Sequence, residues 1–304
     1  MVEVRHWYGF FLSLTTAFMW GVLPVFLTLL LEDMDAISIT WARFTVSAVL
    51  VFLFLRSRAG LLAYHRLGLR TLLILLIATC ALIGNFLLYL KSLNYLNPES
   101  AQVMIQLAPF ILMFGSVYFY QEKFGRPEIL GSALLLFGLG LFFNNRIDEI
   151  FNSFGEYTLG IVIMLCAAIS WGIYGLLQKH LLSMMNSRQL TLFIYCGGAV
   201  GLTLFVTFSS FTGLSLLQYA ALLFCCLNMV IGYGTFTEAL HYWQAAKVSA
   251  VIALAPLITI LSMALAVRLW PQYFSDSELN LVAYAGAIMV VAGSMLGSLG
   301  RRPA

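Results

Sequence analysis

Few side chains of this sequence could do chemistry, and three of them are charged residues inside long apolar runs. Arg43 lies about six residues into its run, or roughly 9 Å below the end of a helix. Such a cation could snorkel to the surface, or it could attract a carboxylate solute or fix a gate. Lys91 and Glu238 lie near the ends of two other runs. Glu238 is the candidate proton site, with an ordinary position at a helix end, three residues before His241, as its alternative.

Two tryptophans and a set of amides and phenols could bind a solute. Trp20 and Trp171 stand half-way through their runs, so their indoles could form opposed walls that offer apolar area and an N–H donor. Core packing beside the glycine that follows each is the alternative. The neighbouring polar candidates are Asn85, Tyr89, Gln102, Gln106, Tyr174 and Tyr233. Gln102 and Gln106 share one helix face, which should point inward or bond a neighbouring helix.

Three prolines within apolar runs predict kinked or broken helices. Pro24, Pro109 and Pro256 each remove an amide donor and free a carbonyl one turn earlier. Broken helices near mid-membrane indicate a transporter site, although a packing kink is also common. Pro109 and Pro256 occupy matching places in the two halves of the chain, which favours a site.

No catalytic site, metal site or cofactor is predicted. The chain has no GxxxxGK[ST] loop, no HExxH motif and no paired carboxylates in mid-run. Its five cysteines lack the CxxC spacing of metal sites and are expected to be small buried hydrophobes. The absence of a TVGYG-type filter or a ring of charges argues against an ion channel.

The elements that position these residues follow from the composition. Hydrophobic residues make up 62% of the 304 residues and charged residues 10%, with a mean hydropathy of +0.94. Soluble domains are roughly half apolar and about a quarter charged, so most of this chain should face lipid. A net charge of +3 is too small for a nucleic-acid surface. Ten runs are long enough to cross a membrane as helices: 9–30, 37–55, 70–92, 98–120, 127–144, 157–178, 188–209, 217–240, 247–268 and 281–299.

Charges in the connecting segments predict the orientation. With the N-terminus in the cytoplasm, twelve of the 16 cations fall on the inner side, as the positive-inside rule requires. We therefore expect a multi-pass protein of the cytoplasmic (inner) membrane with both termini in the cytoplasm.

The chain also repeats itself. Trp20-Gly21 matches Trp171-Gly172 at an offset of 151, and Ala108-Pro109 matches Ala255-Pro256 at an offset of 147. We expect an all-helical bundle of two five-helix repeats, residues 1–145 and 152–300. Because each repeat has an odd number of crossings, the second is inverted relative to the first, the usual architecture of secondary transporters.

The sequence resembles the drug/metabolite transporter superfamily of the EamA type. The resemblance rests on Trp20-Gly21, on Ala42-Arg43-Phe44, and on the stretch from Leu93 to Pro109 followed by Glu122 and Gly131. It implies a cytoplasmic-membrane carrier for small metabolites, commonly an exporter of amino acids or related compounds. The second half departs from the pattern, because Leu269 stands where a counterpart of Glu122 would be.

The function we expect is a carrier that moves a small amphipathic solute, such as an amino acid, outward by alternating access. A phosphate ester would call for several convergent cations, and only Arg43 lies deep. The alternative is a membrane sensor or scaffold that transports nothing. The partners expected are a small-molecule solute and the lipid bilayer. A homodimer through the glycines of 286–300 is one possibility and a monomer the other.

Overall fold

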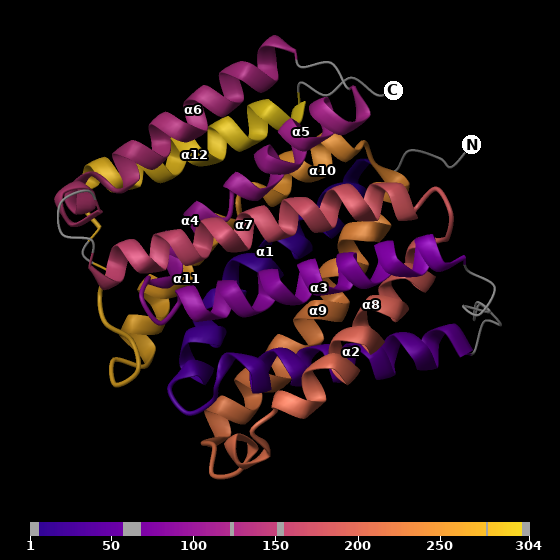
Figure 1. Cartoon of the computed structure of the whole chain (residues 1–304). Helices are drawn as coiled ribbons and strands as arrows, with labels where there is room; N and C mark the ends of the chain where they lie inside the picture. The colour runs from indigo at the N-terminus through magenta and orange to yellow at the C-terminus, as the bar shows by residue number, and fades with distance from the viewer. Residues whose placement is uncertain (1–5, 57–67, 122–124, 151–154, 278, 300–304) are drawn as a thin grey trace.

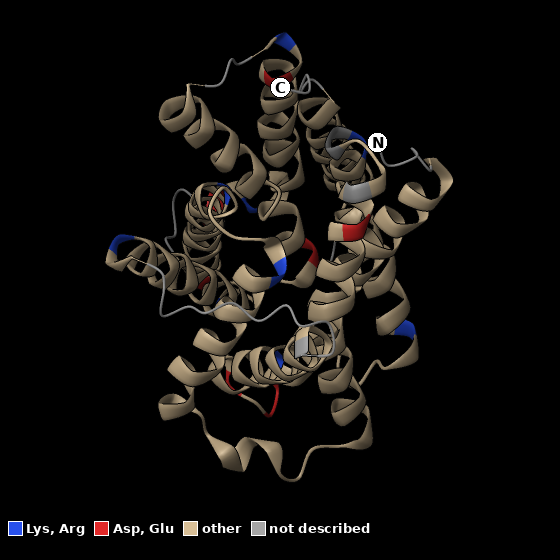
Figure 2. Ribbon diagram, turned by 90° about the vertical axis from the view of Figure 1, so that its right-hand side faces the viewer, with Lys and Arg blue, Asp and Glu red and all other residues tan. Residues whose placement is uncertain are grey.

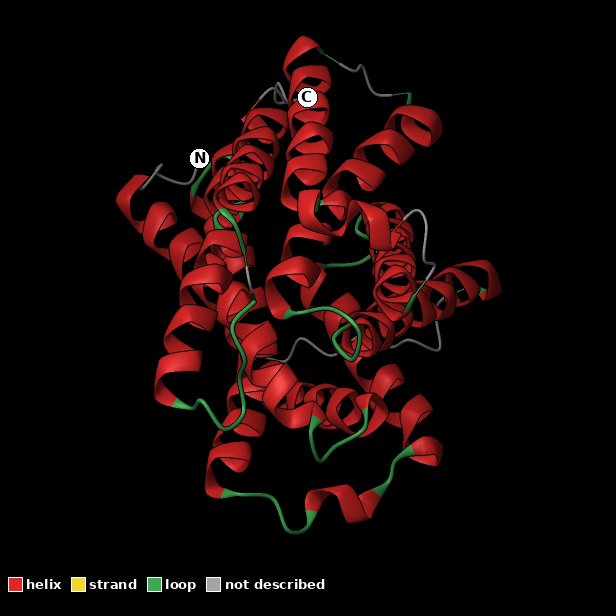
Figure 3. Cartoon of the chain, turned by 90° about the vertical axis from the view of Figure 1, so that its left-hand side faces the viewer, coloured by secondary structure: helices red, strands yellow, loops and turns green. Residues whose placement is uncertain are grey.

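The computed structural model describes residues 6–56, 68–121, 125–150, 155–277 and 279–299. Throughout these residues the regular structure is helical (Figure 3). Glu122 of the family pattern and both chain ends lie outside them. The helices are α1 His6–Leu31, α2 Ala36–Arg56, α3 Leu69–Ser92, α4 Pro98–Met104, α5 Leu107–Tyr120, α6 Arg126–Phe142, α7 Glu156–Leu181, α8 Ser187–Leu202, α9 Leu216–Tyr242, α10 Ala245–Ile252, α11 Ala255–Leu269 and α12 Leu281–Leu299.

These helices make up ten crossings. In the described part of the chain, nine segments are long and apolar enough to span a membrane, with α4–α5 and α10–α11 each counted as one. The tenth, α6, has 17 residues, or about 26 Å of helix, which is close to the thickness of a bilayer core. Lys, Arg, Asp and Glu are sparse along the ribbon (Figure 2).

One predicted span is shorter than expected. The run 188–209 is helical only to Leu202 and continues in two short 3₁₀ turns, Thr203–Phe205 and Phe208–Phe211. Residues 203–213 include the β-branched Thr203, Val206, Thr207 and Thr212 and the hydroxyl-bearing Ser209 and Ser210. The Thr212 hydroxyl donates to the Ser209 carbonyl at 2.7 Å, and Gly213 has φ +81°. Such local side-chain bonds compete with helix formation, so hydropathy alone overestimates this helix.

The prolines act in two different ways. Pro109 and Pro256 each follow an interruption, between α4 and α5 and between α10 and α11, as their missing amides predict. By contrast, α1 continues through Pro24. The carbonyl that Pro24 leaves without its helical donor belongs to Trp20, and the Gln102 amide donates to it at 3.4 Å. A neighbouring helix therefore supplies the hydrogen bond that the proline removes.

The packing of the two halves is reciprocal. α1 packs against α9, and its counterpart α7 packs against α3, the counterpart of α9. In the same way α1 packs against α11 and α7 against α5, while α2 contacts α8 and α6 contacts α12 (Figure 1). α1 and α7 begin at opposite ends of the bundle (Figure 1). The fold is thus two inverted repeats that interlock, with α1, α3, α7 and α9 at its centre.

Glycines bring α6 and α12 together backbone to backbone. A Cβ at Gly131 would lie 2.5 Å from the Gly297 nitrogen, and one at Gly286 would lie 2.4 Å from the Phe142 nitrogen. The Gly293–Gly297 stripe therefore faces α6 of the same chain. The homodimer through the glycine-rich helices, like the alternative of a monomer, stays a prediction.

Candidate functional site

The two repeated tryptophans lie in an aromatic interior. The Trp20 ring centroid is 5.2 Å from that of Tyr233 and 5.7 Å from that of Phe236. Trp171 and Tyr233 both pack against a buried cluster that includes Tyr174. Both indoles are partly buried. The glycine after each permits a close helix approach, since a Cβ at Gly21 or Gly172 would lie within 2.7 Å of Ile258 or Ile111.

The predicted amides all bond the backbone of another element. Asn85 on α3 donates to the Ala167 carbonyl of α7 at 2.9 Å. Gln102 on α4 donates to the Trp20 carbonyl and accepts a hydrogen bond from the Tyr89 hydroxyl at 2.8 Å. Tyr89, Gln102 and Trp20 thus form one chain of contacts from α3 to α1.

Gln106 joins the two helix interruptions directly. It caps the start of α5, and its side chain donates to the Ala253 carbonyl at 3.1 Å, in the interruption between α10 and α11. Gln106 and Ala253 are counterparts at the offset of 147. The points at which the fourth and ninth crossings break therefore meet each other near the pseudo-twofold axis.

Arg43 is buried rather than extended to a surface. Its side chain is 3% exposed, its Nε donates to the Cys225 carbonyl at 3.3 Å, and its guanidinium lies 4.6 Å from the Phe86 ring centroid. Among the described residues no acidic side chain forms an ion pair with it. Lys91 and Glu238, in contrast, are exposed near helix ends.

Sequence reasoning missed several buried polar residues, among them Asn228, Glu99 and Glu128. Asn228 on α9 is 1% exposed and donates to the Met19 carbonyl. Glu99 and Glu128 are 3% and 5% exposed, and Glu99 accepts a hydrogen bond from the Ser277 hydroxyl. An asparagine in mid-run was the available signal for Asn228. Nothing in the sequence distinguishes the two glutamates, which begin helices, from exposed acids.

Two adjoining clefts lie at one end of the bundle. This acidic end holds Glu32, Asp33, Asp35, Asp148, Glu149 and Asp276. A cleft of about 270 Å³ there is lined in part by Asn97, Arg146 and Ser277, and a second of about 220 Å³ adjoins it.

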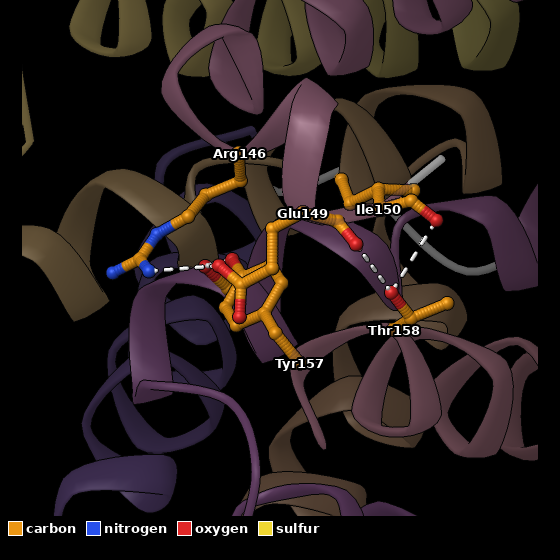
Figure 4. A network of polar contacts seen from close by, with 6 residues as sticks. Arg146, Glu149, Ile150, Tyr157 and Thr158 are labelled. Carbon is orange, nitrogen blue, oxygen red and sulfur yellow. Dashed lines mark hydrogen bonds and ion pairs between the residues drawn. The ribbon is translucent and has the colours of Figure 1, made fainter. Parts of the chain in front are cut away.

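A network of polar contacts lies at the acidic end of the bundle (Figure 4). Arg146 pairs with Glu149 at 3.0 Å and lies 5.1 Å from the Tyr157 ring centroid. The Thr158 hydroxyl bonds the Glu149 carbonyl at 3.0 Å, and the Tyr157 and Ser100 hydroxyls are 2.9 Å apart. The network ties the start of α7 to the start of α4.

One acidic residue of this end caps a helix. Asp35 accepts hydrogen bonds from the amides of Ile37 and Ser38, each at 2.9 Å, and from the Ser38 hydroxyl at 2.6 Å. Partial burial alone would raise the pKa of Asp35, but these hydrogen bonds outweigh it and hold the pKa below its usual value.

Comparison with known proteins agrees with the fold. The model of the EamA-like transporter family matches twice, at residues 7–144 and 158–299. An "Uncharacterized transporter" of Haemophilus influenzae is 40% identical over 301 residues, covering 97% of this chain and 95% of its own. The "Uncharacterized inner membrane transporter YhbE" of Escherichia coli K12 is 39% identical over 296 residues, covering 97% and 92%.

More distant similarities extend this set. The "Probable amino-acid metabolite efflux pump" of Escherichia coli K12 is 21% identical over 310 residues, covering 96% of this chain and 95% of its own. A protein of known crystal structure superposes with a TM-score of 0.64 at 16% identity, covering 97% and 98%. That likeness concerns the fold alone. The whole-length family match selects a transporter over an enzyme, and on these grounds the chain belongs to the EamA-like transporter family.

Proposed function

We propose that the chain is a carrier that exports small amphipathic metabolites of the amino-acid class by alternating access. A distant relative bears the name of an amino-acid metabolite efflux pump, which supports the substrate class and the direction. A closer relative is named an inner-membrane transporter, which supports the inner membrane as the location. The cation-rich end of the bundle is then cytoplasmic, and the acidic end faces outward.

The observation that carries this proposal is the contact between the two helix interruptions. The Gln106 amide donates to the Ala253 carbonyl at 3.1 Å, so a change in one interruption alters the other directly. Interrupted helices at the interface of inverted repeats are where secondary transporters bind solutes. A static scaffold has no need of two matched breaks in contact.

We place the solute among the residues around these breaks. Trp20, Trp171, Tyr174 and Tyr233 supply aromatic walls, and Asn85, Tyr89, Gln102 and Gln106 supply hydrogen-bonding groups. Two clefts open at the acidic end of the bundle.

The experiment is a flux assay on purified protein in proteoliposomes. Vesicles are loaded with a panel of L-amino acids, and counterflow of each labelled compound is measured. We expect flux for a subset, reduced at least about tenfold in Trp171→Ala and Gln106→Ala because both remove groups that contact the solute path. The matched control, Tyr118→Ala, removes an aromatic ring that is 74% exposed on α5 and should leave flux unchanged.

Size-exclusion behaviour and thermal unfolding show whether each variant is folded. Flux that is equal in the wild type and both interior variants would remove these residues from the site. The lack of any flux across the whole panel would contradict the proposed substrate class.

A further inference from the structure

We propose that Arg43 is the centre of a carboxylate-binding site that selects the solute, a deeper statement that rests on the proposed carrier function. The site is formed by one face of α2 and by the aromatic side chains that α3, α8 and α9 place against it. Its ligand is the carboxylate of a small metabolite whose remaining part is apolar or aromatic.

Arg43 is a buried cation with unused hydrogen-bonding capacity. It lies seven residues, or about 10 Å, inside α2 and is 3% exposed. Of its five N–H donors, only the one on Nε has a partner among the described residues, the Cys225 carbonyl at 3.3 Å. The terminal amino groups, which form the fork that grips a carboxylate, bond no group in the described chain.

Two further donors on the same helix face are also unused. Thr40 and Ser47 lie three residues before and four residues after Arg43, so all three side chains share one face of α2. Both are 0% exposed, and neither hydroxyl has a hydrogen-bond partner within the described structure. A buried hydroxyl left without a partner costs free energy, and so does a buried charge without a counter-ion. The three groups together are a set of donors that lacks an acceptor.

The described surroundings supply weak stabilisation for the cation but contain no acidic side chain paired with it. The guanidinium stacks on Phe86 of α3, with 4.6 Å between the guanidinium carbon and the ring centroid. Phe86 belongs to a buried cluster that includes Tyr195 of α8, and Tyr233 of α9 packs against this cluster. An incoming carboxylate would gain a bidentate partner in a medium of low dielectric constant, where such a pair is strongest.

The second half of the molecule has no equivalent site. The counterpart of Arg43 at the offset of 151 is Ile194, which is 1% exposed on α8. The asymmetry suits a solute that is itself asymmetric, with a charged end for α2 and an apolar end for the aromatic walls.

The first test uses the wild-type protein and needs no substitution. The purified chain in detergent is heated with each of a panel of L-amino acids and with the matched carboxamide of each. We expect at least one amino acid to raise the unfolding temperature while its carboxamide does not, because only the carboxylate is an acceptor for the guanidinium fork. Equal stabilisation by acid and amide, or stabilisation by no member of the panel, would overturn the proposal.

The second test asks whether Arg43 is responsible. We expect Arg43→Gln to weaken binding of the stabilising amino acid by roughly 10- to 100-fold, the range of a charge-assisted hydrogen-bonded pair. Arg43→Lys should restore part of it, since lysine keeps the charge but not the fork. Arg268→Gln removes an exposed cation on α11 and should change nothing. An acid-over-amide preference that survives in Arg43→Gln would contradict the assignment.

If Arg43→Gln does not fold, Ser47→Ala and Thr40→Val provide the same test, because each removes one unused donor without burying a new polar group. Each should weaken acid binding severalfold and leave amide binding unchanged. Counterflow of the same compounds separates the two proposals. Flux without acid preference would retain the carrier and reject the site. Acid-selective stabilisation without flux would retain the site and reject the carrier.

Discussion

α1 and α7 begin the two repeats and make the same crossings with different side chains. At the crossing of α1 with α9, Asn228 of α9 donates to the Met19 carbonyl of α1. At the equivalent point between α7 and α3, the donor is on the other helix, since Ser170 of α7 donates to the Ala81 carbonyl of α3 at 2.8 Å. Met19 and Ser170 are counterparts, as are Asn228 and Ala81.

A second pair of contacts shows the same exchange. Asn85 of α3 donates to the Ala167 carbonyl of α7 at 2.9 Å, whereas Thr16 of α1 donates to the Gly232 carbonyl of α9 at 3.4 Å. These positions also match at the two offsets. The inverted fold therefore preserves where a polar bond crosses between helices, but not which helix provides the donor. Two chemically different walls result from one backbone arrangement.

The largest difference in stability that we predict between the two repeats is at Gly21 and Gly172, the glycines that follow the repeated tryptophans. A Cβ at Gly21 would lie 2.7 Å from Ile258 Cβ and 2.8 Å from the Ala255 carbonyl oxygen, and neither atom can move without its helix. At Gly172 the nearest atom is Ile111 Cγ2 at 2.6 Å, but the nearest backbone atom, the Leu112 nitrogen, is 3.5 Å away. Gly21→Ala should cost about 2–3 kcal/mol of stability and Gly172→Ala about 1 kcal/mol.

Unfolding in mixed micelles of increasing denaturing detergent measures both values. Gly140→Ala, where a Cβ meets no atom within 4 Å, is the matched control and should be neutral. Equal costs at Gly21 and Gly172 would show that the two crossings are equally rigid.

We expect an intermediate loss of stability when the hydrogen bond to the Trp20 carbonyl is removed. Pro24 deprives this carbonyl of its helical donor and Gln102 replaces it at 3.4 Å, whereas the counterpart of Pro24 is Gly175, which keeps its amide. Gln102→Leu should therefore cost about 1–2 kcal/mol, because a buried acceptor is left unbonded. In a Pro24→Ala background the same substitution should cost less, since the amide of residue 24 returns.

Ser249, the counterpart of Gln102, is exposed, and Ser249→Ala should change stability by no more than about 0.5 kcal/mol. A double-mutant cycle on Pro24 and Gln102 measures their coupling. Strict additivity would mean that Gln102 does not serve the freed carbonyl.

The smallest effect concerns the caps of α2 and α8. Asp35 caps α2 and its counterpart Asn186 caps α8, where it accepts from the Gln189 amide at 3.0 Å. Since the folded pKa of Asp35 is lowered, its contribution is complete above its unfolded pKa and is lost as the pH falls through the folded value. Acid should remove up to about 1 kcal/mol, the worth of a helix cap.

Asp35→Asn should abolish that part of the pH dependence, because an amide does not titrate. Asn186→Asp should introduce a new loss of stability at acid pH, because the cap of α8 would then titrate. Stability curves between neutral and acid pH compare the variants with the wild type, and identical curves for Asp35→Asn and the wild type would reject the assignment.

Hydropathy, proline positions and repeated glycines are sufficient to predict much of this fold. The ten crossings, the breaks before Pro109 and Pro256 and the tight approach at Gly21 and Gly172 all follow from properties that each segment carries itself. The predicted end of α8 was wrong, because a hydropathy profile takes no account of the local hydroxyl hydrogen bonds that compete with helix formation.

The candidate site is harder to predict because its hydrogen bonds join segments far apart in the sequence. A comparison of the two repeats in sequence does not identify Asn228, because its counterpart is Ala81. In the other repeat the equivalent hydrogen bond has its donor on the opposite helix, at Ser170. Nor could the sequence decide whether Arg43 snorkels or is buried, because that depends on Phe86 and Cys225 of other helices. The assignment of solute contacts to Trp20, Trp171 and the other interior residues stays a prediction.

The glycine contact between α6 and α12 constrains how such a molecule can move. One helix comes from each repeat, and their backbones touch without intervening side chains, so sliding or separating them would open an interface that has no flexible atoms to refill it. In the proposed transport cycle we therefore expect this pair to stay in place while the remaining helices move. The groups of helices that move against each other would then differ from the two duplicated repeats. The reason is that α6 and α12, the pair that stays in place, are the last helices of the two repeats.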